Sequence, residues 1–294
     1  MKIGMTIEPI KGMSLKQILF LLRRIGLDHL EVNATIIPRV DEFVKSIKKF
    51  TTTFHLPIYD RFYYDIGSTN ELFKERIENV ISFLNEQKEH MNLKYILTHP
   101  PEDSSSSNET LLNRLEQIDV PILIENIIGQ TDEEFTEFYF KAKDHLGKKL
   151  AGHAVDIPHR YVTNSETWLD IPEELVKEIE YIHISDCTKN ADLHLPLGMG
   201  ELPYNEFFEL LKKINFSGIF LQEVIPSVDQ IGTLMDSFMA NVKPFSKSKY
   251  LNMKMKCGII GPLLFVTVSM AYKALKRKGH GLHATDLAFD LVSH

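Results

Sequence analysis

The chain has 294 residues, of which 44% are hydrophobic and 25% are charged, so it is able to bury a large core. This composition excludes a disordered or fibrous protein. The two cysteines, Cys187 and Cys257, are too few for a disulfide framework or an all-cysteine zinc site. They lead us to expect a reducing, cytoplasmic environment. The first residues after Lys2 contain no long apolar stretch, so we expect no secretory signal.

The net charge of −7 is spread unevenly along the chain. Residues 246–294 carry eight Lys/Arg and two Asp, whereas residues 1–245 carry 25 basic and 38 acidic residues. A protein that holds nucleic acid mainly through its phosphates needs the opposite sign on its main body. The sequence therefore has no strong nucleic-acid signature. Bound divalent cations would offset part of the acidity, so nucleic-acid binding stays open as an alternative.

Short β-rich runs alternate with helical stretches along the first 245 residues. The expected strands are Lys2–Thr6, Asp28–Val32, Thr51–Leu56, Leu93–His99, Pro121–Asn126, Leu150–Asp156, Tyr181–Asp186 and Gly218–Val224. The clearest helical patterns are Leu15–Ile25, Asn70–Glu86, Thr131–His145 and Tyr204–Ile214. Signals for helix starts and stops support these ranges, with N-caps predicted at Ser14, Asn70 and Thr131 and C-terminal stops at Gly26 and Gly147.

Eight strands, each followed by a helical or partly helical segment, predict a (β/α)8 TIM barrel over residues 1–245. An open, doubly wound sheet is the alternative. Residues 246–294 form a predicted C-terminal extension, in which 257–272 is uncharged and flanked by Lys. These 16 residues fall short of the ~20 that a membrane span needs. We therefore expect no membrane span, but a helix packed against the barrel or a partner chain, with homo-oligomerisation through this extension and membrane contact as alternatives.

Histidines and carboxylates gather at the expected carboxyl ends of the strands, which in a barrel converge on one face. The nine candidate residues come from six consecutive strands and the loop after the seventh: His55, His99, Glu125, Asp156, His159, His183, Asp192, His194 and Glu223. A single histidine at a strand end is usually structural, and His29 and His153, within strands, are interpreted that way. Glu31 ends the second strand and is a further carboxylate that is able to face the same region.

Four carboxylates at one barrel mouth would repel each other and be costly to desolvate without compensating charge. Divalent metal ions provide that charge, because imidazole and carboxylate are suitable ligands for Zn, Mn, Fe and Co. Nine ligands are too many for one ion and fit two or three. We therefore predict a divalent metal site with zinc as the preferred ion.

The ordered set, together with the stretch from His183 through Asp192 and His194 to Glu201, resembles the xylose isomerase-like TIM-barrel superfamily. This superfamily includes endonuclease IV, of the second apurinic/apyrimidinic endonuclease family, and the sugar-phosphate isomerases and epimerases. Endonuclease IV holds three zinc ions with nine ligands, and the resemblance implies that all nine candidates are ligands, with Glu125 bridging. The isomerases and epimerases use a smaller set around one metal, which corresponds to Glu125, Asp156, His183 and Glu223, with His159 available for substrate.

The resemblance supports two enzymatic hypotheses. The first is a metal-dependent phosphoester hydrolase with Glu125, Glu223 and His159 as catalytic residues, acting on a small phosphorylated substrate or on abasic DNA. The second is a sugar or sugar-phosphate isomerase or epimerase, in which Glu125 or Glu223 moves a proton next to a carbonyl. The segment after His55 does not reproduce the DNA-inserting loop of endonuclease IV, and the first 32 residues look more like the isomerase branch. A non-catalytic metal-binding protein that docks through residues 246–294 is the third alternative.

Overall fold

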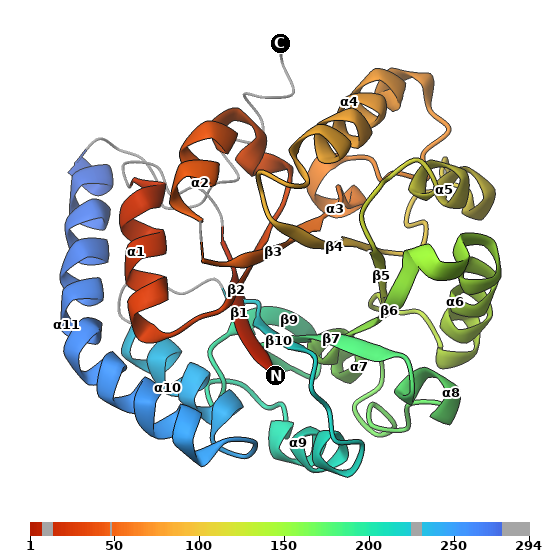
Figure 1. Ribbon diagram of the computed structural model, residues 1–294. Coiled ribbons are helices and arrows are strands. Elements are labelled where there is room, and N and C mark those ends of the chain that lie inside the picture. Colours follow the sequence, from red (N-terminus) through yellow and green to blue (C-terminus); the bar gives the residue numbers. More distant parts are fainter. Residues whose placement is uncertain (8–13, 48, 225–230, 278–294) are drawn as a thin grey trace.

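The computed structural model describes residues 1–7, 14–47, 49–224 and 231–277 of the chain. Eight parallel strands close into a barrel with helices around its outside (Figure 1). In barrel order the strands are β1 (Lys2–Thr6), β2 (His29–Val32), β3 (Thr51–His55), β4 (Leu93–Thr98), β5 (Ile122–Glu125), β6 (Leu150–Asp156), β7 (Ile179–Ile184) and β10 (Ile219–Gln222). The pairing of β1 with β10, in which Lys2 lies beside Ile219, closes the barrel. The predicted (β/α)8 TIM barrel is therefore confirmed.

The helices surround the barrel in chain order. They are α1 (Leu15–Ile25), η1 (Ala34–Arg39), α2 (Val40–Ser46), α3 (Tyr59–Phe62), α4 (Glu71–Gln87), α5 (Asn108–Leu115), α6 (Asp132–Leu146), η2 (Gly147–Lys149), α7 (Ile157–Thr163), α8 (Glu173–Val176), α9 (Tyr204–Lys213), α10 (Ile231–Val242) and α11 (Lys247–Arg277). Asn70 caps α4 and Thr131 caps α6 as predicted, the latter in a capping box with Glu134. Ser14 precedes α1 without a capping bond of its own, and Glu42 accepts the hydrogen bond from the Leu15 amide instead.

Side chains of the strands alternate between the inside of the barrel and the outer core, because successive strand residues point to opposite faces. The outward residues pack against the helices in the main hydrophobic core. A smaller cluster, which includes Leu97, Leu123, Tyr181 and Leu221, fills the barrel interior. The interior is crowded at Gly4, where a Cβ atom would lie 2.9 Å from the His29 carbonyl oxygen. The next inward position on each strand is at the barrel mouth, and this alternation decides which residues form the site.

A short two-stranded hairpin was not expected from the sequence. It consists of β8 (Asp186–Thr188) and β9 (Ala191–Leu195), which follow β7 and pair antiparallel. Asp186 therefore lies outside β7, and its carboxylate accepts hydrogen bonds from the backbone of Cys187, Gly198 and Leu202. These bonds hold the two ends of the hairpin that carries Asp192 and His194 on β9.

The chain continues after the barrel into the long helix α11, which packs against α1 and α10 (Figure 1). The division into residues 1–245 and 246–294 stays a prediction, and residues 278–294, with His280, His283 and His294, lie outside the described residues. Within the described ranges, the helices are too short or too polar to cross a membrane.

His153 of β6 is fully buried, and it faces α6, where its ring lies 4.7 Å from that of Phe135 and 5.9 Å from that of Tyr139 between centroids. Neither of its ring nitrogens has a hydrogen-bond partner in the described part of the chain. Burial, assisted by the nearby Arg160, lowers the pKa of His153 to about 3. The folded chain therefore keeps this imidazole neutral under conditions in which the unfolded chain protonates it.

We expect the His153→Leu variant to be more stable than the parent by about 1–3 kcal/mol at pH 7.5, because no unpaired nitrogen is buried. The difference in unfolding free energy should grow as the pH falls from about 6.5 toward 3, because only the unfolded parent gains a proton at this position. The expected slope is about 1.4 kcal/mol per pH unit. Urea unfolding of both proteins across this pH range measures the difference. The exposed His90→Gln variant is the control, and a difference for His153→Leu that does not change with pH would contradict the account.

Candidate metal centre at the barrel mouth

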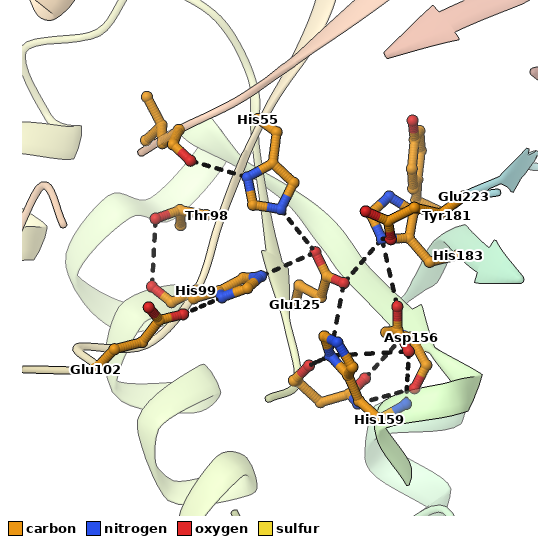
Figure 2. A network of polar contacts seen from close by, with 12 residues as sticks. His55, Thr98, His99, Glu102, Glu125, Asp156, His159, Tyr181, His183 and Glu223 are labelled. Carbon is orange, nitrogen blue, oxygen red and sulfur yellow. Dashed lines mark hydrogen bonds and ion pairs between the residues drawn. The ribbon is translucent and has the colours of Figure 1, made fainter. Parts of the chain in front are cut away.

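The structure brings all nine candidate residues into one connected set of nitrogen–oxygen contacts of 4.0 Å or less. Figure 2 shows the part of this set formed by His55, His99, Glu125, Asp156, His159, His183 and Glu223. Five of them end or directly follow barrel strands at inward positions, as Glu125 does on β5 and Asp156 on β6. His183 lies one residue before the end of β7 and is register-paired with Asp156. The other three come from the start of α7 and from β9. The residues predicted to converge at one barrel mouth therefore do lie together there.

The Glu125 carboxylate lies at the centre of this set and is almost fully buried. Its Oε2 is 3.4 Å from His55 Nε2 and 3.3 Å from His99 Nε2, whereas its Oε1 is 2.8 Å from His183 Nδ1. Two groups with the spacing of metal ligands therefore share this one side chain. The first group is His55, His99 and Glu125, and the second is Glu125, Asp156, His183 and Glu223.

The second group has more acceptors than donors. The single nitrogen Nδ1 of His183 faces three carboxylates, with Glu125 at 2.8 Å, Glu223 at 3.2 Å and Asp156 at 3.6 Å. One imidazole nitrogen carries at most one proton, so at most one of these contacts is a well-formed hydrogen bond. A divalent cation among them would satisfy all three carboxylates and the nitrogen together. The donor set therefore fits a metal ion of the kind that binds imidazole and carboxylate.

In four of the histidines, one ring nitrogen is hydrogen-bonded to a carbonyl or carboxylate oxygen outside the two ligand groups, and the other ring nitrogen faces the site. Nδ1 lies 2.9 Å from the Leu56 carbonyl oxygen in His55 and 2.9 Å from the Asn126 carbonyl oxygen in His159. Carbonyl oxygens only accept, so Nδ1 donates in both residues and Nε2 is left for a ligand bond. His99 and His183 are held in the same way by carboxylates, those of Glu102 and Glu31. This tautomer control is typical of histidines that bind metals.

A third set of residues lies beside the second group. Asp192 Oδ2 is 3.5 Å from His159 Nε2 and 3.5 Å from His194 Nε2. His194 Nδ1 is buried and has no hydrogen-bond partner within the part of the chain that the structure describes. His159, Asp192 and His194 are thus close to one another, but less tightly gathered than the two groups that share Glu125.

The charges of the cluster shift the pKa values of its members. Burial acts to lower the pKa of His99, but the Glu125 and Glu102 carboxylates outweigh it and raise this pKa to about 9. In the same way, Asp156 and Asp192 outweigh burial and raise the pKa of His159 to about 10. Burial raises the pKa of Asp156 to about 6. Without a cation, protons on the histidines balance the carboxylates, and a metal ion would replace these protons.

Two carboxylates that support the site were not assigned a role from the sequence. Glu31 does face the barrel interior, where its Oε2 accepts from His183 Nε2 at 2.9 Å and from the Tyr181 hydroxyl at 2.9 Å. Glu102, three residues after His99, was missed altogether. Its signal in the sequence is weak, because it lies in a loop after two prolines whose path the strand pattern does not define.

Comparisons with known proteins agree with this architecture. A family model described as xylose isomerase-like TIM barrel matches residues 19–241. An uncharacterised protein of Methanocaldococcus jannaschii, MJ1614, is 30% identical over 208 residues, which cover 63% of this chain and 75% of the relative.

Two solved structures share the fold. A D-tagatose 3-epimerase-like protein aligns with a TM-score of 0.61 and 18% identity, covering 83% of this chain and 98% of its own. A family 2 AP endonuclease from Brucella melitensis aligns with a TM-score of 0.60 and 13% identity, covering 84% and 99%. The sequence match over residues 19–241 shows that the chain belongs to the xylose isomerase-like TIM-barrel family.

Proposed function

We propose that this protein is a metal-dependent phosphoester hydrolase with a multinuclear site at the barrel mouth. The observation that carries the proposal is the position of Glu125, whose two carboxylate oxygens face two different ligand groups. A second group of ligands is not needed to bind one ion for sugar isomerisation, whereas paired ions suit displacement at phosphorus. Zinc fits the donors best, with up to three ions if His159, Asp192 and His194 hold one; Mn, Fe and Co share the same ligand preferences.

The proposed ligands differ in exposure, which separates their roles. Glu125 is 1% exposed and enclosed by histidines, so it holds ions and does not reach substrate. Glu223 is 24% exposed and is therefore the carboxylate placed to orient an attacking water and accept its proton. Ions bound here would polarise the phosphoryl group and lower the pKa of water toward ~7. His159, at the edge of the cluster, is available to a third ion or to a phosphate oxygen.

The charge of the barrel favours a small phosphorylated substrate over duplex DNA. The excess of acidic over basic residues in 1–245 would repel a long phosphate backbone. A short or isolated phosphoester needs only the local positive charge of the ions. Abasic DNA stays the alternative substrate of the same chemistry.

Sugar isomerisation or epimerisation is the second candidate. It is favoured by the four-residue group of Glu125, Asp156, His183 and Glu223, which has the size of a site for one ion. The likeness to a D-tagatose 3-epimerase-like structure gives the same candidate. In that case Glu223 would move the proton next to the carbonyl, and His55 and His99 would contact sugar hydroxyls or phosphate.

A paired assay separates the two candidates. Protein loaded with Zn²⁺ or Mn²⁺ is incubated with bis(nitrophenyl) phosphate and, in deuterium oxide, with free and phosphorylated aldoses and ketoses. We expect release of nitrophenolate that stops when the metal is chelated and returns on reloading, and no deuterium in the sugars. Deuterium incorporation without hydrolysis would overturn the hydrolase proposal in favour of an isomerase.

A further inference from the structure

Helix α11 has an apolar side that the barrel does not cover. The helix packs against α1 and α10, and Met253 and Cys257 in its first half are buried (Figure 1). The opposite side carries large apolar residues that are 51–70% exposed: Leu251, Met255, Ile259, Val266 and Met270. Their spacing of four, four, seven and four residues places them on one face of the helix. A contiguous exposed apolar stripe of this kind marks an interaction surface.

The same surface is strongly basic. Helix α1, which lies beside α11, carries the exposed residues Lys16, Arg23 and Arg24, and α11 carries the exposed residues Lys247, Lys254 and Lys273. Neither helix contains an Asp or Glu, whereas the rest of the chain has 23 basic and 40 acidic residues. Exposed Phe20 adds an aromatic ring to this face, with the Arg24 guanidinium 5.0 Å from its centroid. We call the exposed side of these two helices the α1–α11 face.

We propose that the α1–α11 face binds the surface of an anionic lipid bilayer. Apolar side chains would enter the acyl boundary and the basic residues would contact lipid phosphates, which is how basic amphipathic helices lie in a membrane interface. The uncharged part of α11, residues 257–272, is about 24 Å long, which is less than the ~30 Å hydrocarbon core. The helix therefore lies along the surface, and the acidic remainder of the chain, repelled by the lipid, orients this face toward it.

Charge also favours an anionic lipid bilayer over two other partners of this face, a second copy of the chain and nucleic acid. A second copy paired through α11 would place basic residues against basic residues, because the helix has no acidic group to neutralise them. Nucleic acid would satisfy the charges but would leave the apolar stripe without a partner. An anionic bilayer matches both properties of the surface.

The test is sedimentation of the whole protein with vesicles of phosphatidylcholine and phosphatidylglycerol in equal amounts, and with vesicles of phosphatidylcholine alone. We expect partition into the anionic vesicles that weakens with added salt, and little partition into the neutral ones. The Lys254→Gln/Lys273→Gln and Met255→Gln/Ile259→Gln variants should each lower the partition coefficient roughly tenfold or more. The Leu72→Gln variant, at an 81% exposed apolar residue on α4, should leave it unchanged.

Three results would overturn the proposal. Equal partition of the parent and the two double variants would show that this face is not the one that binds. Absence from anionic vesicles together with a solution mass of two chains, lowered to one chain by Met255→Gln/Ile259→Gln, would assign the face to a second copy. Absence from vesicles with salt-sensitive binding to duplex DNA would assign it to nucleic acid. None of these variants changes a residue of the barrel mouth, so each should keep the phosphoesterase activity of the parent. Failure of the lipid proposal is therefore distinguishable from failure of the proposed hydrolase function.

Discussion

The Glu125→Gln variant is expected to lose at least ~1000-fold in metal-dependent phosphoester hydrolysis, which corresponds to about 4 kcal/mol of transition-state stabilisation. The amide has nearly the shape of the carboxylate but no charge, and only its oxygen is a ligand. It is therefore unable to serve the His55/His99 group and the His183 group at once, although both lie against Glu125 in the structure. Steady-state hydrolysis and metal content of the purified variant measure the two effects.

The control for this variant is Glu116→Gln, which removes one charge from an exposed carboxylate that is ion-paired with His145 and not with a residue of the barrel mouth. It should retain parental activity and metal content. A Glu125→Gln protein that keeps both its metal and its activity would contradict the bridging role.

The double variant His55→Ala/His99→Ala should remove one ion and lower hydrolysis at least ~100-fold, while the second group keeps its ligands. The two imidazoles both direct Nε2 at Glu125 Oε2, and neither contacts Asp156 or Glu223 in any described pair. Metal content should therefore fall by one ion and not to zero. Elemental analysis after saturation, together with the hydrolysis assay, checks this result.

His90→Ala/His145→Ala, which removes two histidines outside the site, is the matched control and should change neither quantity. If the His55→Ala/His99→Ala variant lost hydrolysis but kept the metal content of the parent, His55 and His99 would be assigned to substrate binding, as the isomerase alternative requires.

The sequence was sufficient to predict the barrel and the convergence of the site, because both follow from local patterns. Strands such as Lys2–Thr6 and Leu150–Asp156 match their predicted bounds, since short apolar runs between turn signals are a local property. Inward positions at the strand ends, such as His55 and Glu125, follow from the alternation of side chains along a strand.

The supporting groups were not predictable in the same way, because they depend on loop paths and on distant contacts. Glu102 reaches His99 only because the loop after β4 turns back, where its other oxygen accepts from the Tyr59 amide at 2.7 Å. The sequence identified Glu31 as a carboxylate that is able to face the site. Its contact with His183 was not predictable, because it depends on how β2 and β7, which are not neighbours in the barrel, approach each other. The β8–β9 hairpin was missed because its strands are short and carry polar residues.

The number of ions held at Glu125 tests the account most directly. Crystals of the metal-saturated protein, measured above and below the absorption edge of the bound metal, give the ions and their positions. We predict at least two peaks, one among His55, His99 and Glu125 and one among Glu125, Asp156, His183 and Glu223. A single peak, or a folded chain that takes up no ion at all, would contradict the multinuclear site.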